Sequence, residues 1–183
     1  RMSEIFSRRV FLRGLGVVAA AAALTACSST NEAVNQALIE GAVGGIVAAD
    51  CKIGRMTYWA ANATVPVYEI SFRIVMTNVS SKPVTLSGDN FATTLDGTPI
   101  PPFNFSARDV GDADIWRTYD SLTIRPGEER SIALAYEISQ PTYDSWYKSS
   151  RTVAVSFTCG NQRVTYTKNS RSDEITVSDI ETL

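Results

Sequence analysis

The chain has 183 residues, of which 44% are hydrophobic, and a formal net charge of −2. It contains no histidine and only three cysteines, which excludes Ser-His-Asp and Cys-His catalysis, His-ligated metals and imidazole pH switches, and leaves too few thiols for a cysteine-ligated cluster. We therefore expect one globular domain without a cofactor.

The first 26 residues have the layout of an export signal. A basic start is followed by a short Ala-rich apolar run, residues 15–24, that ends in small residues, as export signals do. The run is about half of the ~20 apolar residues that cross a bilayer. A permanent transmembrane helix is therefore the weaker alternative.

Two motifs in this stretch resemble known bacterial export and lipidation signals. Residues 7–12, Ser-Arg-Arg-Val-Phe-Leu, resemble the twin-arginine export motif. Its matching residues are Arg8, Arg9, Phe11 and Leu12. Residues 24–27, Leu-Thr-Ala-Cys, resemble the lipobox, where bacterial lipoproteins are lipidated on the cysteine and cut before it. The resemblance implies loss of residues 1–26 and an acylated Cys27 that anchors an extracytoplasmic protein to the cell membrane.

An acylated Cys27 makes the lipid membrane the first expected partner, because each buried CH₂ of its acyl chains contributes about 0.8 kcal/mol. Residues 27–183 carry 13 basic and 18 acidic side chains, a net charge of −5. Such a charge repels nucleic acid, so we expect no nucleic-acid partner. Residues 27–45 are either a flexible tether or a short amphipathic helix, since Ser29 and Glu32 have capping-box spacing.

From Ile46 onward the hydrophobic period changes to two, which predicts strands. In the clearest strand, an apolar face alternates with a face that carries Glu69, Ser71 and Arg73. The first strand is expected to turn Val47, Ala49, Cys51 and Ile53 toward the core. The predicted strands cover residues 46–53, 67–77, 84–86, 91–95, 98–103, 122–125, 132–138, 153–159 and 164–166.

Turns and loops separate these strands. Asp96-Gly97 predicts a tight hairpin, and Pro126-Gly127 has the residues that a type II turn requires. Residues 104–119 and 139–150 break the alternation and are predicted as long loops. The acidic end, residues 171–183, is either a frayed tail or an edge strand.

Seven to nine short antiparallel strands with regular turns are typical of an all-β sandwich. Three pieces carry a further resemblance. They are residues 68–83, with a strand ending in Thr-Asn and a Ser-Lys-Pro turn, residues 89–97 and residues 122–128. They resemble the immunoglobulin-like family of unknown function common in Gram-positive surface lipoproteins, related to mycobacterial immunoprotective extracellular antigens. The resemblance implies an immunoglobulin-like β-sandwich over residues 46–170 and brings no catalytic site.

Cys51 and Cys159 both occupy apolar positions of predicted strands. Outside the cytoplasm such a pair tends to oxidise, and the large loop that it closes could contribute about 4.7 kcal/mol. We expect a disulfide, with two buried thiols as the alternative.

Two loop features are candidates for binding. Clustered carboxylates suit Ca²⁺, but their spacing is not that of a calcium loop, so we expect a solvated acidic loop with no metal and keep calcium as the alternative. The acidic candidates are Asp109, Asp112 and Asp114. Loop aromatics either form a recognition patch or fold back to close the core. These aromatics are Trp116, Tyr119, Tyr143, Trp146 and Tyr147.

The sequence therefore predicts a lipid-anchored envelope protein whose sandwich is a binding module for an envelope protein or glycan, and not an enzyme. A structural accessory subunit of an envelope complex is the alternative. A hydrolase of envelope polymers is the weaker one, because no spaced motif singles out a nucleophile.

Overall fold

Two antiparallel sheets pack face to face in the computed structural model, which describes residues 41–58, 64–102, 104–110 and 116–183. The all-β sandwich predicted from the sequence is confirmed. The export signal, Cys27 and residues 28–40 of the tether lie outside the described residues. Within the described parts, no helix is long and apolar enough to cross a membrane.

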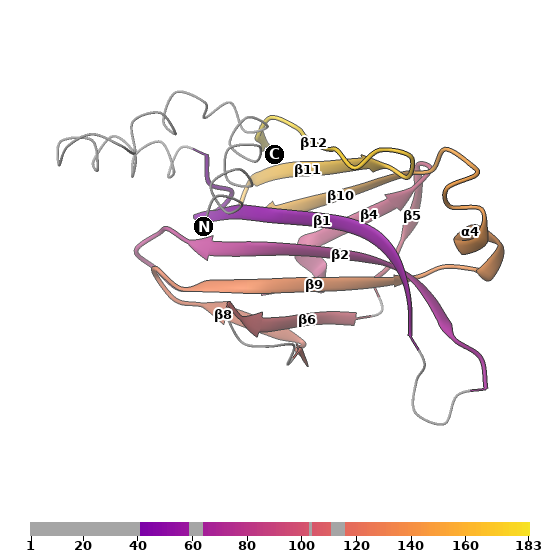
Figure 1. Cartoon of the computed structure of the whole chain (residues 1–183). Coiled ribbons are helices and arrows are strands. Elements are labelled where there is room, and N and C mark those ends of the chain that lie inside the picture. Colours follow the sequence, from indigo (N-terminus) through magenta and orange to yellow (C-terminus); the bar gives the residue numbers. More distant parts are fainter. Residues whose placement is uncertain (1–40, 59–63, 103, 111–115) are drawn as a thin grey trace, which may run out of the picture.

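The first sheet has the strand order β1-β2-β9-β6-β7 and the second β12-β11-β10-β4-β5, with β13 also paired to β11. The two layers are seen in Figure 1, and α4 lies at one end of the sandwich. The strands of the first sheet are β1 (Ile46–Tyr58), β2 (Val67–Asn78), β9 (Glu129–Glu137), β6 (Asn104–Asp109) and β7 (Arg117–Thr118). Those of the second are β12 (Ile175–Val177), β11 (Gln162–Asn169), β10 (Thr152–Cys159), β4 (Phe91–Leu95), β5 (Thr98–Ile100) and β13 (Glu181–Thr182).

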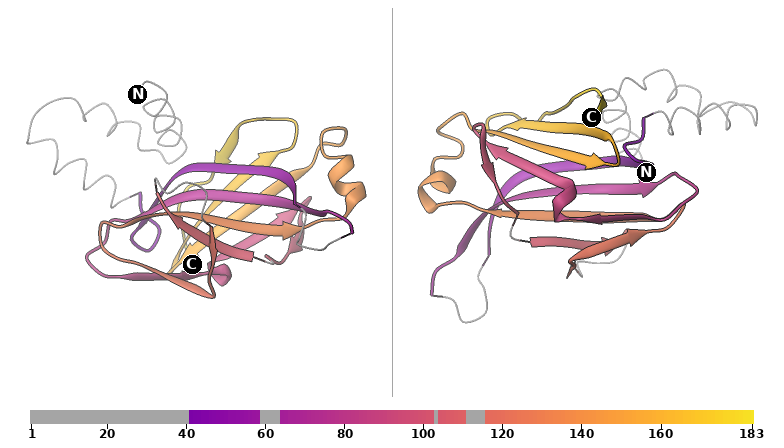
Figure 2. Two further views of the ribbon diagram at one scale, coloured as in Figure 1. Left: turned by 60° about the horizontal axis from the view of Figure 1, so that its bottom comes forward. Right: turned by 180° about the vertical axis from the view of Figure 1, so that it is seen from behind.

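A two-stranded sheet, β3 (Val84–Ser87) with β8 (Ser121–Ile124), and the 3-10 turn η2 (Gly88–Asn90) complete the sandwich, which Figure 2 shows from two further sides. The described residues hold thirteen strands, more than the seven to nine predicted. The additional strands are β6, which lies in a predicted loop, and β7, β12 and β13, which are only two or three residues long. Such short strands carry too few residues to show a period.

The core lies between the two sheets because the long strands alternate as predicted. In β2 every second side chain is buried, and Phe72 tilts against Phe91 and Tyr166 of the opposite sheet, with ring centroids 6.1 and 5.8 Å away. The inward residues of β2 and β9 are Ile70, Phe72, Ile74, Met76, Ile132, Leu134 and Tyr136, each at most 1% exposed. The outward faces of the same strands are therefore left to build the site.

The predicted inward face of β1 is wrong over its first half. The structure buries Ile46 and Ala48 rather than Val47 and Ala49. The pairing with β2 shifts between Ala49 and Lys52, where Asp50 has φ 49°. This β-bulge inserts a residue and reverses the alternation, so that only the second half of the strand follows the predicted parity.

Both predicted long loops contain regular structure. Residues 104–109 form β6, which turns Phe105 and Ala107 inward and pairs with β9. Two inward apolar residues are too few to give a visible period, which is why the sequence indicated a loop. The second loop contains the short helix α4 (Gln140–Asp144), whose N-cap Ser139 accepts a hydrogen bond from the Thr142 amide at 3.3 Å.

The hairpin turns are confirmed. Asp96 and Gly97 both have positive φ, 51° and 81°, as a type I′ turn requires, and Gly127 has φ 74° at the third position of its turn. Of the two alternatives for the acidic end, the structure has edge strands, because β12 and β13 both pair with β11.

The sandwich begins before Ile46. Ala42 and Val43 are buried, and Val43 pairs with Ile46. The Gly44 amide donates to Gln162 Oε1 at 2.9 Å, and a Cβ at Gly44 would meet Cys159 Sγ at 2.4 Å, so only glycine fits there. The end of the predicted tether is thus part of the domain.

Candidate functional site

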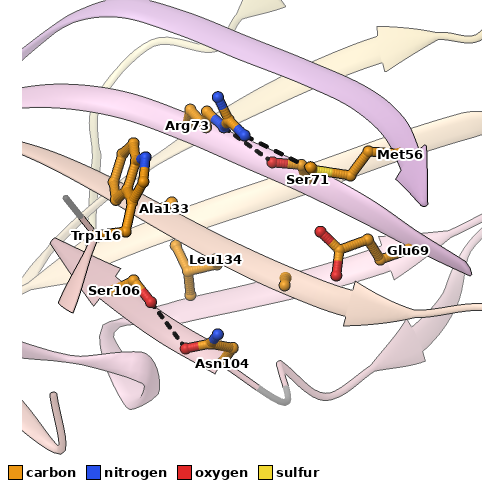
Figure 3. A pocket seen from close by; sticks show the side chains of 10 residues that line it. Met56, Glu69, Ser71, Arg73, Asn104, Ser106, Trp116, Ala133 and Leu134 are labelled. Atoms are coloured by element: carbon orange, nitrogen blue, oxygen red, sulfur yellow. Dashed lines mark hydrogen bonds between the residues drawn. The ribbon is translucent and has the colours of Figure 1, made fainter. Parts of the chain in front are cut away.

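The outward face of the first sheet carries a shallow hollow of about 220 Å³ (Figure 3). Strands β1, β2, β9 and β6 contribute to it, together with Trp116 just before β7. The lining residues are Met56, Glu69, Ser71, Arg73, Asn104, Ser106, Trp116, Ala133, Leu134 and Ala135.

The hollow exists because the middle strand has small outward residues. In β9 the outward positions between the core residues are Ala133 and Ala135. The register places Ala135 between Ser71 of β2 and Asn104 of β6, and it places Ala133 between Arg73 and Ser106. Two methyl groups therefore form a low floor between two rows of longer polar side chains.

Glu69 is the unusual group of this hollow. Its side chain is on the outward face, yet the residue is only 5% exposed. No hydrogen bond or ion pair joins its carboxylate to any other residue that the structure describes. Burial raises the pKa of the Glu69 carboxyl above its ordinary value, and the positive charge of Arg73 opposes that rise. In Figure 3 the carboxylate points into the space over β9.

Arg73 and Trp116 form the other end of the hollow. The Arg73 guanidinium lies 5.5 Å from the Trp116 ring centroid, and the Arg108 guanidinium lies 4.9 Å from the same ring. Arg73 also donates to Ser71 Oγ at 3.3 Å and approaches Met56 Sδ at 3.7 Å. The described carboxylates include none that forms an ion pair with Arg73, so its charge is available to a ligand.

The polar rim on β6 is held in place by its own hydrogen bonds. Ser106 Oγ donates to Asn104 Oδ1 at 2.9 Å, as the lower dashed line of Figure 3 shows, and Thr118 Oγ1 donates to the same oxygen at 3.3 Å. Ser106 is only 8% exposed. The rim is therefore ordered before any ligand arrives, as a binding site requires.

The predicted loop aromatics do not form one patch. Trp116 lines the hollow, and Tyr119, between β7 and β8, packs against the core. Trp146 is 2% exposed and belongs to the core itself. Tyr143 and Tyr147 lie at the α4 end, where their rings flank the Arg55 guanidinium at 4.2 and 4.6 Å.

The predicted disulfide is wrong: the structure holds Cys51 and Cys159 as free thiols. Both point toward the core, but at different places. Cys159 lies against Gly44, whose carbonyl its thiol approaches at 3.8 Å, whereas Cys51 lies in the β1 bulge within reach of the Lys168 charge. Burial raises the pKa of the Cys51 thiol to about 12. Sequence position alone could not show that the two thiols sit at separate points along the sheets.

The acidic candidates also separate. Asp109 ends β6 with its side chain 61% exposed and forms an ion pair with Arg130. Asp112 and Asp114 lie outside the described residues. Among the residues with described positions, no cluster of three potential metal ligands occurs.

The sequence did not single out the hollow, although two of its signals were present. Glu69, Ser71 and Arg73 were correctly placed on the outward face of β2. The alternating alanines of residues 131–135, Ser-Ile-Ala-Leu-Ala, mark a strand with a low outward face. Reading the two signals together requires the knowledge that β2 and β9 are neighbours, which the sequence does not provide.

Comparison with known proteins places the chain among distant structural relatives. No family model matches the sequence, and no curated protein matches it. Solved structures of bacterial β-sandwich proteins do resemble the fold. The yjhA protein of Bacillus subtilis is 16% identical, with 62% of this chain and 73% of that chain covered and a TM-score of 0.39. An uncharacterized β-sandwich protein of Clostridium difficile 630 is 14% identical, with 68% and 83% covered and a TM-score of 0.40.

A third similar structure is that of ycdA, a candidate lipoprotein of Bacillus subtilis. It is 11% identical, with 72% of this chain covered and a TM-score of 0.41. The match spans only 38% of the ycdA chain. These likenesses are distant and concern the sandwich architecture alone.

Proposed function

We propose that this protein is an extracytoplasmic lipoprotein, anchored to the cell membrane by acylated Cys27, and that its immunoglobulin-like sandwich is a binding module for an envelope component. The ligand site is the hollow on the outward face of β2, β9 and β6. The observation that supports this proposal is Glu69, which is 5% exposed, lines the hollow and has no hydrogen-bond or ion-pair partner among the described residues. Its carboxylate oxygens are not among the fully buried atoms, so they can accept hydrogen bonds from a ligand that enters the hollow.

The anchor follows from the two motifs at the start of the chain. Arg8 and Arg9 precede the apolar run, and Cys27 follows Leu-Thr-Ala. Two or more acyl chains on Cys27 hold a protein at a membrane where a single chain does not. The sandwich is then displayed beside the envelope, which is where surface lipoproteins of the immunoglobulin-like family act.

Binding suits the hollow better than catalysis does. Ser71 Oγ accepts a hydrogen bond from Arg73, and Ser106 Oγ donates to Asn104. Both hydroxyls are thus used as parts of the rim, and neither is hydrogen-bonded to a base among the described residues, as a nucleophile must be. The roles left for them are to orient a ligand and to hydrogen-bond with it.

The site is tested by nuclear magnetic resonance on the isotope-labelled chain. We expect soluble fragments of the cell envelope to shift the backbone resonances of Glu69, Arg73 and Ala133, and we expect Glu69→Gln to weaken those shifts. Thr123→Ala, on the exposed face of the β3-β8 sheet, is the matched control and should change nothing. Shifts that cluster elsewhere on the sandwich, or a Glu69→Gln chain that binds equally well, would reject the hollow as the site.

The anchor is tested separately in bacteria grown with labelled palmitate. The parent chain should incorporate label and remain with the membrane fraction, and Cys27→Ala should do neither. Replacing Arg8 and Arg9 by lysine should leave the protein unexported. Palmitate on Cys27→Ala would contradict this assignment of the anchor.

A further inference from the structure

We infer that the hollow binds a pyranose sugar residue that carries a carboxylate, with the acidic group at Arg73 and the ring hydroxyls at Glu69. This inference rests on the proposed function and narrows its ligand to one chemical class. Three features of the hollow support it: its floor and rim, the charges at its two ends, and its size.

The floor and rim match the shape of a pyranose. The floor consists of the Ala133 and Ala135 methyl groups, and polar groups stand on both sides of it, Ser71 on β2 and Asn104 with Ser106 on β6. A pyranose ring has apolar C–H faces and hydroxyls around its edge. Lying flat, such a ring places one face on the alanines and its hydroxyls against the rim, where each can donate and accept.

The two ends of the hollow have opposite charge. Glu69 and Arg73 are four residues apart on one strand, about 13 Å along β2. Glu69 accepts only, and the strand register adds the exposed Glu137 beside it. At the other end, Arg73 and Arg108 both lie over the Trp116 ring. A ligand that matches both ends donates toward Glu69 and presents an anionic group to Arg73.

An acidic sugar meets both demands. Its carboxylate can pair with the Arg73 guanidinium through charge-assisted hydrogen bonds, which are about twice as strong as neutral ones, while its hydroxyls donate to the Glu69 carboxylate. An amine without an acid would be repelled by the Arg73 guanidinium.

The size of the hollow limits how much of a glycan it can hold. Its volume, about 220 Å³, is below the roughly 300–1,000 Å³ of sites that enclose drug-sized ligands. It is also open on one side, because it lies on a sheet face (Figure 3). One sugar residue fits the hollow, and the rest of a glycan can extend into solvent.

The experiment uses a matched pair of sugars, methyl β-D-glucuronide and methyl β-D-glucoside, titrated calorimetrically into the full chain. The two differ only at the carboxylate. We expect the glucuronide to bind at least tenfold tighter. Arg73→Gln should abolish this preference by weakening the glucuronide at least tenfold, whereas Glu69→Gln should weaken both sugars about tenfold. Thermal unfolding of each variant shows that it is folded, and Arg73→Lys, which keeps the charge, should retain part of the preference.

The outcomes separate the two proposals. Equal affinity for both sugars would overturn the assignment of an acidic ligand. If neither sugar binds while an envelope fragment still shifts the resonances of the hollow, then the sugar class is wrong and the proposed site stands. If neither sugars nor envelope fragments bind, then both the inference and the proposed function fail.

Discussion

Each end of strand β2 holds a buried polar side chain, and the two side chains differ in their hydrogen bonding. Asn78, the last residue, is 0% exposed, and Glu69, near the first, is 5% exposed. The Asn78 amide donates to the carbonyls of Lys82 and Ile124, both at 2.8 Å, and its oxygen accepts from the amide and hydroxyl of Ser80 at 2.9 and 2.8 Å. Glu69 has no such bond to a described residue.

The difference separates a polar group that stabilises the fold from one that lines the candidate site. Asn78 uses both halves of its amide to join the turn after β2 to the end of β8, so its burial adds to the stability of the fold. Glu69 has no such partner among the described residues, and burial raises the pKa of its carboxyl, so its burial adds nothing to that stability. In the function proposed above, a ligand makes use of this carboxylate.

The largest loss of stability is expected for a substitution of Trp146, which lies at the same end of β2 as Glu69. Trp146 is 2% exposed and follows α4, where Tyr143 packs on Tyr68 of β2 with ring centroids 5.1 Å apart. Trp146→Ala should lower the free energy of unfolding by about 4 kcal/mol, because a large core side chain is lost and a cavity remains.

Chemical denaturation of Trp146→Ala beside Tyr147→Ala measures this effect. Tyr147 is 63% exposed, and its loss should cost less than about 0.5 kcal/mol. A small effect of Trp146→Ala would mean that this end of β2 is loosely packed. Loose packing would then be enough to explain why Glu69 has no described hydrogen-bond partner, without a ligand.

The next effect tests the Asn78 end directly. Asn78→Ala should lower the free energy of unfolding by about 3 kcal/mol, since the carbonyls of Lys82 and Ile124 lose their donor in a buried place. Asn169→Ala is the control, because its two side-chain bonds, to the Ser150 hydroxyl and from the Arg171 amide, are both exposed. If the two variants have the same free energy of unfolding, then Asn78 does not have the structural role that its four hydrogen bonds indicate.

The Asn78 end was largely predictable from the sequence, and the reason is that its chemistry is local. Asn78, Ser80 and Pro83 lie within six residues of one another, and turn residues of these types bond their own backbone. The long alternating strands were predictable for a similar reason: β2 and β10 show their inward faces over several residues without help from neighbours.

The hollow was not predictable because no local pattern contains it. Its charge comes from β2, its floor from β9 and its rim from β6, and these strands are brought together by a register that only the folded chain shows. The β1 bulge and the separation of Cys51 from Cys159 were missed for the same reason. Both features depend on the register between neighbouring strands, which the alternation of apolar and polar residues does not reveal.

A smaller effect should follow from removing the charge of Glu69. Because burial raises the pKa of this carboxyl, the folded state holds its proton more tightly than the unfolded state does. The free energy of unfolding therefore falls as the pH rises through the interval above the ordinary value of 4.5. Arg73 limits this fall, and the neighbours across the strands are Met56 and the exposed Glu137.

Glu69→Gln keeps the shape of the side chain and removes this dependence. It should stabilise the chain by about 1 kcal/mol at neutral pH, and the gain should disappear below about pH 4.5, where the parent carboxyl is protonated in both states. Glu137→Gln, at an exposed position, serves as the matched control. A Glu69→Gln chain that is less stable than the parent at pH 7 would show that the carboxylate has a stabilising partner.

The smallest effect is expected for a third buried polar group, which lies on the core side of β9. Tyr136 is 0% exposed, and burial raises the pKa of its phenol to about 12. The Thr93 hydroxyl opposes that rise, yet neither oxygen has a partner at hydrogen-bonding geometry among the described residues.

Tyr136→Phe should change the free energy of unfolding by less than about 0.5 kcal/mol, because it removes a hydroxyl that satisfies nothing and keeps the ring. The reason that this unpartnered group marks no ligand site is its charge: a neutral hydroxyl in the core costs little, whereas an ionised carboxylate costs much more. Thr93→Val and the double variant provide the check. If Tyr136→Phe costs more than about 1 kcal/mol and the double variant costs no more than that, the two hydroxyls bond each other. Of Asn78, Glu69 and Tyr136, only Glu69 would then lack a partner among the described residues.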